Sequence, residues 1–146
     1  MAHPRKVIRD AVVQALTGLV ATTTHVHATR TQPLEAEQLP ALCIYTLDET
    51  SELDALSPRK MMRQLTLIVE AVAQVNDTID DALDQICLEV ETQLGTNFTL
   101  GGLVKDCRLA STKIAVRGQG EKDTGSAVMS FDILYRTLAA DASLIA

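Results

Sequence analysis

Residues 61–75, which read MMRQLTLIVEAVAQV, decide the fold class of this sequence. Apolar side chains occupy every second position from Leu65 to Ala73, and polar residues such as Gln64 and Thr66 lie between them. A period of two residues places the apolar side chains on one face of a β-strand and the polar ones on the other. We therefore predict a strand whose apolar face packs against a hydrophobic core.

Four other stretches have the composition of strands. Residues 126–138 repeat the alternation, and residues 41–47 (ALCIYTL) are apolar on both faces, which is typical of a central strand. Residues 104–116 alternate imperfectly around Ser111, as a β-bulge would make them. Residues 22–29 are rich in β-branched side chains and predict one more strand.

Two stretches have helical periodicity. From Pro4 to about Leu19, apolar residues recur every three or four positions, which predicts an amphipathic helix. A second helix is expected to begin at a cap formed by Asn76 or Asp77 and to end at Gly95. The apolar residues of this second helix follow the same spacing: Ile79, Leu83, Ile86, Val90 and Leu94.

Two charged stretches predict loops. Asp48 to Pro58 contains four acidic residues and no basic one, which indicates an acidic loop. Arg117 to Gly125 contains three glycines and four charged residues and connects two predicted strands, which indicates a long hairpin loop. Such a loop has little core of its own, so we expect it to be mobile in the free protein and ordered by a neighbouring molecule.

The predicted order α, β, β, β, α, β, β indicates an α+β fold. We expect a single largely antiparallel four- to five-stranded sheet with two amphipathic helices packed on one face. The other face is partly polar and is expected to meet solvent or a neighbouring copy. No linker or internal repeat divides the chain, so residues 1–138 are predicted to form one domain and residues 139–146 a C-terminal tail.

The composition limits the classes of function. The 146 residues, of which 47% are hydrophobic, are enough for one domain with a buried core. Thirteen basic and nineteen acidic residues give a net charge of −6, which opposes tight binding to nucleic-acid phosphates. No stretch approaches the roughly 20 apolar residues of a membrane span, and the first residues lack the apolar block of a signal peptide. We therefore expect a soluble protein that is not secreted.

The cysteines favour a reducing environment. Cys43, Cys87 and Cys107 are odd in number, widely spaced and set among apolar neighbours. This pattern suits buried, reduced thiols in a cytosol better than a disulfide framework. We interpret all three as parts of the core.

No pattern in the sequence predicts catalysis, a cofactor or a metal centre. The glycine-rich residues 118–124 do not fit G-x-x-x-x-G-K-[ST] and connect two strands, so we interpret them as a hairpin tip or a docking loop. His25 and His27 share one face of a predicted strand, but no carboxylate or cysteine nearby completes a metal site. The acids from Asp77 to Asp84 have helical spacing, unlike a calcium loop. Neither G-x-S-x-G nor a cysteine beside a histidine is present.

The order of several short motifs carries a resemblance to a known family. The first helix contains VIRDAVVQAL (7–16) and is followed by RTQP (30–33) and LPALCIY (39–45). Asp48-Glu49 comes next, then a long strand rich in leucine and valine, and then an acidic helix start with Leu83-Asp84. In this order the sequence resembles the tail terminator proteins of long-tailed phages, the family of the lambda minor tail protein U. The matching strand of that family reads Phe-Pro-Ala-Val-x-Val-Tyr.

The resemblance covers most of Pro4 to Thr137, whereas the glycine-rich hairpin and residues 139–146 align with nothing in the family. It implies a structural protein without catalytic activity that forms a six-membered ring on the end of a growing tail tube. The implied partners are other copies of itself in a homohexamer ring, the tail tube protein, and a head-completion or connector protein. DNA passes through the lumen only as cargo, and no membrane is involved. The implied location is the head-proximal end of the virion tail, with assembly in the host cytoplasm.

Charged residues in or beside the predicted loops are candidates for contacts between subunits or with partners. They are Arg30, Arg59, Arg63, Arg117 and Lys122 on the basic side, and Glu49, Glu52, Glu121 and Asp123 on the acidic side. Two alternatives to the tail terminator stay open. One is a small cytosolic protein-binding module without catalytic activity, and the other is an enzyme whose site is contributed across subunits.

Overall fold

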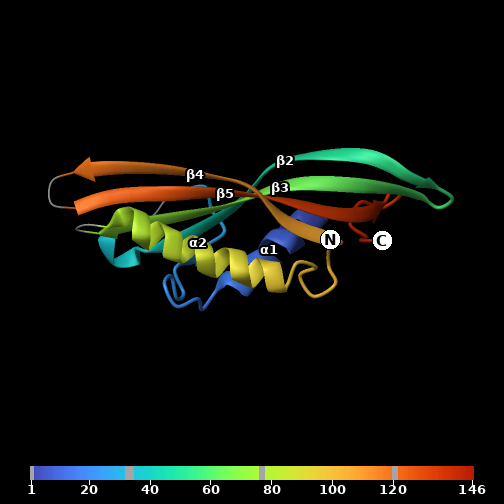
Figure 1. The fold of residues 1–146 in the computed structure, drawn as a ribbon. Helices are drawn as coiled ribbons and strands as arrows, with labels where there is room; N and C mark the ends of the chain where they lie inside the picture. The colour runs from blue at the N-terminus through green and yellow to red at the C-terminus, as the bar shows by residue number, and fades with distance from the viewer. Residues whose placement is uncertain (1, 32–34, 76–77, 120–121) are drawn as a thin grey trace.

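Strand β3 (Arg59–Val75) lies at the centre of a five-stranded sheet with the order β1-β2-β3-β5-β4. The computed structural model describes residues 2–31, 35–75, 78–119 and 122–146 (Figure 1). Strands β2, β3, β5 and β4 pair antiparallel, and β1 pairs parallel with β2. The remaining elements are α1 (Pro4–Leu16), β1 (Val26–His27), the 3-10 helix η1 (Ala36–Gln38), β2 (Ala41–Leu56), α2 (Ile79–Thr96), β4 (Asp106–Gln119) and β5 (Lys122–Leu138).

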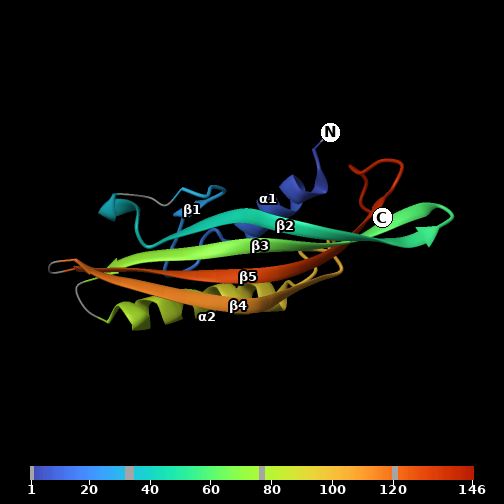
Figure 2. The same ribbon diagram turned by 90° about the horizontal axis from the view of Figure 1, so that it is seen from above.

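Both helices cover the same face of the sheet, as Figure 1 shows. Helix α1 packs beside β2, and α2 runs beneath β3, β5 and β4 (Figure 2). The apolar residues of β3 that were predicted to face a core, from Leu65 to Ala73, are buried against these helices. The predicted α+β class, with one mostly antiparallel sheet and two helices on one face, is therefore confirmed.

The core lies between the helices and the middle of the sheet. The helical periodicity brings Ile8, Val12 and Leu16 of α1 onto this face, where each is fully buried. Strand β5 contributes every second residue, as its alternation predicted. Fully burying one large aliphatic or aromatic side chain stabilises a fold by about 1.5–3 kcal/mol. The core residues of β5 are Ala127, Met129, Phe131, Ile133 and Tyr135.

The first helix and the strand after it are shorter than predicted. Helix α1 ends at Leu16 and not at about Leu19, because Gly18 leaves the helical region with a φ of +95°. The strand predicted over residues 22–29 is limited to β1, since Thr23 turns the chain with a φ of +50°. Its threonines therefore belong mainly to a turn.

Helix α2 follows its predicted periodicity but differs at its ends. Thr78 occupies the N-cap position, and the expected cap residues Asn76 and Asp77 lie outside the described residues. Gly95 does not end the helix, which continues to Thr96. A single glycine weakens a helix by about 1 kcal/mol, which the packing of the apolar face overrides here.

The predicted acidic loop at residues 48–58 is wrong, because β2 continues through Leu56 and pairs with β3. The ladder runs from Ala41 opposite Val72 to Leu56 opposite Arg59, with bulges after Thr46 and Leu53. The side chains of this part of β2 are mostly exposed. A strand that is exposed to solvent on both faces needs no alternation of apolar and polar residues. The acidic residues of this stretch therefore did not indicate a strand.

The predicted long hairpin loop at residues 117–125 is also wrong. Strand β4 continues to Gln119 and β5 begins at Lys122, and Arg117 pairs with Thr124. Residues 120 and 121 lie outside the described residues. The bulge that was expected near Ser111 is confirmed by a register shift between Leu109 and Ser111.

The C-terminal residues 139–146 fold back onto the end of β5. The amide of Ala146 donates to the carbonyl of Arg136 at 2.9 Å, and the amide of Leu138 donates to the carbonyl of Leu144 at 3.1 Å. These bonds use backbone groups of β5 that lie beyond the end of its ladder with β4. The tail thus covers that end of the strand.

The β2–β3 hairpin extends well beyond the helices at one end of the molecule, and the ends of β4 and β5 that meet at their hairpin project past α2 at the other end (Figure 1). We call residues 47–64 of β2 and β3 the β2–β3 arm. We call the described part of residues 111–124, in β4 and β5, the β4–β5 arm. The middle of the sheet has a core of its own, whereas each arm is held mainly by its strand pairing.

Candidate functional site

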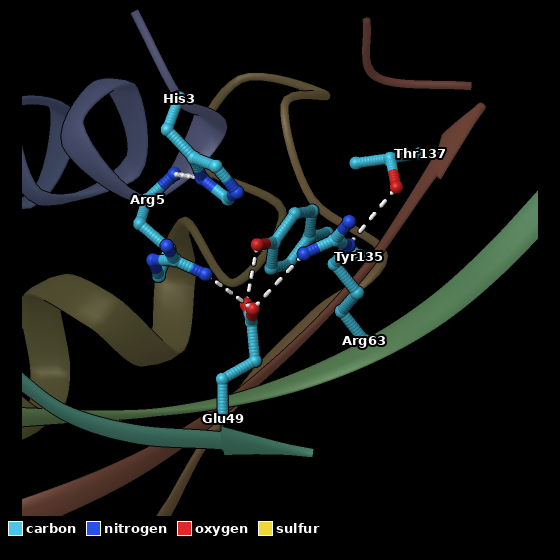
Figure 3. Close-up of polar contacts among 6 residues, drawn as sticks. All are labelled: His3, Arg5, Glu49, Arg63, Tyr135 and Thr137. Atoms are coloured by element: carbon cyan, nitrogen blue, oxygen red, sulfur yellow. Dashed lines mark hydrogen bonds and ion pairs between the residues drawn. The ribbon is translucent and has the colours of Figure 1, made fainter. Parts of the chain in front are cut away.

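The most connected polar site lies at the base of the β2–β3 arm and centres on Glu49 (Figure 3). One carboxylate oxygen of Glu49 accepts from Arg5 at 2.7 Å and from Arg63 at 3.1 Å. The other accepts from the hydroxyl of Tyr135. Arg63 also donates through Nε to Thr137 Oγ1 at 2.9 Å. We call these five residues the Glu49 cluster.

The four elements that build the cluster are brought together by the fold. Arg5 lies in the first turn of α1, Glu49 in β2, Arg63 in β3, and Tyr135 with Thr137 in β5. The Glu49 side chain retains 9% of its exposure, and Tyr135 and Thr137 are fully buried. The cluster therefore fixes α1 and the base of the β2–β3 arm to the centre of the sheet.

Electrostatics keep Glu49 ionised. Burial by itself raises the pKa of Glu49, but the hydrogen bonds from Tyr135, Arg5 and Arg63 outweigh it and lower the pKa below its usual value. Burial, together with the neighbouring Glu49 carboxylate, raises the pKa of Tyr135. The tyrosine is thus a stable donor to a stable carboxylate. These directions are those expected of a structural ion pair.

His3 lies at the edge of this site and caps α1. Its Nδ1 accepts from the amide of Arg5 at 3.1 Å. Burial, followed by the positive charge of Arg5, lowers the pKa of His3. A neutral imidazole keeps the lone pair that this cap requires.

A second polar contact group lies on the helix-free face of the sheet, at the edge of β2. The Arg30 guanidinium lies 5.0 Å from the centre of the Tyr45 ring and donates to the carbonyl of Thr46. The hydroxyl of Tyr45 donates to Glu70 at 3.2 Å. Arg30 therefore occupies the backbone edge of β2 just before the β2–β3 arm begins.

The three cysteines are free thiols and are buried, as the sequence indicated. Burial raises the pKa of Cys43 and of Cys87 to about 11, and that of Cys107 to about 12. A thiol with such a pKa is protonated at neutral pH and is a weak nucleophile. Cys87 and Cys107 belong to the core between helix and sheet.

Among the predicted contact residues that the structure describes, Glu49 and Arg63 are brought together as an ion pair. Both are engaged within the chain and do not lie in a loop. Glu52 and Arg117 are exposed strand residues, in β2 and β4 respectively, and Arg59 begins β3. The remaining candidates are Arg30, described above, Lys122 and Asp123 at the start of β5, and Glu121, which lies outside the described residues.

Sequence reasoning missed Arg5, Tyr135 and Thr137. Arg5 is one of the polar residues of an amphipathic helix, and Tyr135 has the alternation of an ordinary core residue, so neither stands out in the sequence. Glu49 lies 44 residues from Arg5 and 86 residues from Tyr135 in sequence. No local pattern reports such a contact, and the only signal was an acidic residue next to a predicted strand.

Within the described ranges, no group of three histidine, cysteine or carboxylate side chains is placed to hold a metal ion. A groove with a volume of about 470 Å³ lies between the C-terminal end of α2 and β4. It is open, and apolar side chains such as Phe98 and Leu109 line it. In the same part of the chain, no helix is long and apolar enough to cross a membrane.

The fold and the Glu49 cluster define an α+β protein whose most developed polar site serves structure. The chain belongs to the phage minor tail protein U family, whose family model matches residues 3–135. It is therefore a structural protein of phage tails and a component of the virion.

The chain was also compared with solved structures and with curated protein sequences. A chain in the solved structure of the virion of a native gene transfer agent particle is 9% identical, with a TM-score of 0.39. The alignment covers 87% of this chain and 94% of that chain. No curated protein sequence matches the chain.

Proposed function

We propose that this protein is a tail terminator. It forms a six-membered ring on the end of the tail tube, stops the polymerisation of the tube protein, and presents a docking surface to a head-completion or connector protein. DNA passes through the ring as cargo. The protein acts at the head-proximal end of the tail, and it is assembled into the tail in the host cytoplasm. It has no enzymatic activity. The match of residues 3–135 to the minor tail protein U family carries this proposal.

The architecture supports a ring in physical terms. The two edges of the sheet are formed by different strands, with β1 and β2 at one edge and β4 at the other. Contact between two different surfaces is heterologous, and it gives a ring when the rotation closes and a fibre when it does not. A cap on a tube requires closure. The acidic balance of the chain, −6 in net charge, also suits a lumen through which DNA passes without binding.

The predicted contact residues divide into two groups under this proposal. Glu49 and Arg63 hold the base of the β2–β3 arm in place. Glu52, Arg59, Arg117 and the charged residues from Glu121 to Asp123 contact other subunits or partners. Arg30 orders the edge of β2 at Thr46.

The experiment that tests the proposal is polymerisation of the tail tube protein with and without this protein, followed by electron microscopy and mass photometry. We expect rings at the tube ends, an arrest of elongation, and a particle of six chains of 15.8 kDa. Tubes without the protein should continue to grow. The finding of only monomers and dimers, free and on assembled tails, contradicts the ring. Binding to a single cytosolic partner without any effect on tubes favours a protein-binding module instead.

A further inference from the structure

We propose that neighbouring copies in the ring meet through opposite edges of the sheet, with Leu47 of one copy in the groove beside Phe98 and Leu109 of the next. On the other face of the same contact, Asp48 of the first copy faces Arg108 of its neighbour. The inference rests on the ring proposed above, and it names the surface that closes the ring.

Asp48 on β2 and Arg108 on β4 lie at the same level along the strands, on opposite sides of the sheet (Figure 2). The ladders connect them in three steps: Asp48 pairs with Thr66, Thr66 with Asp132, and Asp132 with Arg108. Directly paired residues share a face of the sheet, and Asp132 alternates with the core residues of β5. Asp48 and Arg108 therefore both point to the helix-free face.

A ring axis along the strands brings these two edges together. Rotation about such an axis changes neither the level of a residue along the strands nor the direction of a strand. The β4 edge of one copy therefore meets the β2 edge of the next at matching levels. The two surfaces are different, so the contact is heterologous, as a ring requires.

Both edges are uncovered at this level in the described part of the chain. Strand β1 pairs with β2 at Leu42 and Cys43, before the level of the contact. From residue 47 onward β2 is paired with β3 alone, and β4 is paired with β5 alone. Asp48 is exposed, and the side chain of Arg108 retains 69% of its exposure.

Arg108 has the capacity for a second acidic partner. Its Nη2 lies 3.7 Å from the carboxylate of Asp132 in the same chain. An exposed ion pair of this kind stabilises the fold little, and a guanidinium carries five N–H donors. Arg108 can therefore bind Asp48 of a neighbouring copy together with its own Asp132.

Leu47 is the extra residue of a β-bulge at the edge of β2. The ladder shifts register between Thr46 and Asp48, and Leu47, which lies between them, is 55% exposed. Leu47 lines a hollow with Arg5 of α1 and the core residue Leu65, so it lies on the helix-covered side. A bulge re-aims a side chain relative to the regular ladder. Leu47 thus offers an apolar side chain to a molecule beside β2.

The groove between the C-terminal end of α2 and β4 lies at the matching level of the opposite edge. The three ladders place Leu109, which lines the groove, level with Thr46, the neighbour of Leu47. Phe98 lines the groove from the other side and is 49% exposed. A leucine side chain that enters this groove removes apolar surface of both copies from water, which stabilises the contact.

The charges around the two surfaces are complementary. Glu91 and Asp106 border the groove, whereas Arg5 and Arg30 border the hollow beside Leu47. The side chain of Arg5 retains 41% of its exposure, and Arg30 is exposed. Opposite charges across a contact fix its register and oppose other pairings.

The contact leaves most of both arms free. It lies at the base of the β2–β3 arm and at the beginning of β4, far from the two hairpin ends (Figure 1). With the axis along the strands, the β2–β3 arms project from one face of the ring and the β4–β5 arms from the other. A cap needs two such different faces, one for the tube and one for the head-completion protein.

The test exchanges the two charges in the full chain. Asp48→Arg places two cations at the contact and Arg108→Asp places two anions there. Each variant should raise the protein concentration required for rings by at least about tenfold. The double variant restores opposite charges and should form rings at close to the wild-type concentration. Mass photometry and electron microscopy of tails measure ring formation.

Two matched controls lie outside the contact. Lys113→Asp makes the same charge change on the same face of β4, but Lys113 lies level with Cys43, where β1 covers the edge. It should form rings like the wild type. Leu47→Asp should weaken rings by at least about tenfold. Leu53→Asp changes a leucine of β2 that is 49% exposed and lies beyond the level at which β4 begins, so it should not weaken them.

Circular dichroism and urea unfolding confirm that each variant is folded. If Arg108→Asp affects rings no more than Lys113→Asp does, or if the double variant does not recover them, the contact is wrong and the ring stands. Rings of Leu47→Asp at the wild-type concentration also overturn the contact. If the wild type forms no rings even on tails, the proposed function itself fails.

Discussion

The middle of the sheet and its two arms are made from the same strands but are stabilised differently. In the middle, one face of β3 and β5 is buried beneath two helices. In the arms, the same backbone ladders continue while most side chains of β2 and β4 remain in water. Burial of apolar side chains in the middle therefore stabilises the fold, whereas the exposed side chains of the arms are available for contacts with neighbouring molecules. The Glu49 cluster lies where the two regions meet.

The largest expected effect compares Ile133 in the middle with Ile114 in the β4–β5 arm. Ile133 is fully buried and Ile114 is 50% exposed. Ile133→Ala should lower the free energy of unfolding by about 2–5 kcal/mol through a lost transfer term and a cavity. Ile114→Ala should lower it by less than about 1 kcal/mol in the isolated chain. Urea unfolding of dilute protein measures both, and equal losses contradict the distinction.

The next effect compares two glutamates of β2, Glu49 and Glu52. Glu49→Gln removes the charge that pairs with Arg5 and Arg63, so we expect a loss of about 3 kcal/mol in the free energy of unfolding. Glu52→Gln changes an exposed side chain and should remain within about 0.5 kcal/mol of the wild type. Chemical unfolding at neutral pH is the measurement. A loss below 1 kcal/mol for Glu49→Gln shows that the cluster does not hold the arm.

A third effect compares Gly125 of β5 with Gly95 of α2. A Cβ on Gly125 meets side-chain atoms of Ile79 and Leu83 at 2.8 and 3.0 Å, whereas a Cβ on Gly95 meets nothing within 4 Å. Gly125→Ala should therefore destabilise the protein by about 1–3 kcal/mol through overpacking beneath the start of α2. Gly95→Ala should leave stability unchanged or raise it by up to about 1 kcal/mol, because alanine favours a helix. Thermal unfolding distinguishes them, and a neutral Gly125→Ala shows that α2 shifts without loss.

The fourth prediction concerns Cys87, a thiol of the middle region. Cys87→Ala should lower the free energy of unfolding by about 1 kcal/mol or more through a small cavity, without abolishing assembly. Reducing agent should change neither stability nor assembly, because the three thiols are free and buried. Urea unfolding and mass photometry measure the two properties. A variant that folds normally and has lost assembly gives the thiol a functional role.

The smallest expected effect is the pH dependence that Glu49 contributes. Its pKa in the folded protein is lower than the value of 4.5 for an ordinary glutamate, so the folded state favours the ionised form. The stabilisation is therefore fully present above about pH 4.5 and is lost as the pH falls through the lowered pKa of the folded state. The stability difference between wild type and Glu49→Gln should shrink as the pH falls below that value. A difference that is constant down to acid unfolding contradicts the ion pairs.

The sequence predicted the middle of the molecule well and the arms poorly, for one physical reason. Burial of one face imposes a period of two on β3 and β5 and a period near 3.6 on the helices, and those periods are visible in the residues. The stretch from Asp48 to Leu56 is mostly exposed, as are Arg117 and Gly118, so no buried face imposes a period on the residues there. The charged residues and glycines of these stretches then suggest loops. Each stretch nevertheless lies in a paired strand wherever it is described.

Gly125 shows the same limit at a single residue. In the sequence it ends a glycine-rich segment and suggests flexibility. In the structure it is buried within β5, where the absence of a side chain lets α2 approach the sheet. Close approach and flexibility both favour glycine, and only the position of Ile79 distinguishes them.

The ladder between β3 and β5 has a mechanical consequence. It runs from Lys60 opposite Leu138 to Val75 opposite Asp123 without a bulge, along the length of the molecule. A pull directed along these strands loads many backbone hydrogen bonds at the same time, so they must rupture together. A pull across the strands opens the bonds one after another and requires less force. The protein is thus stiffest against tension along its long axis.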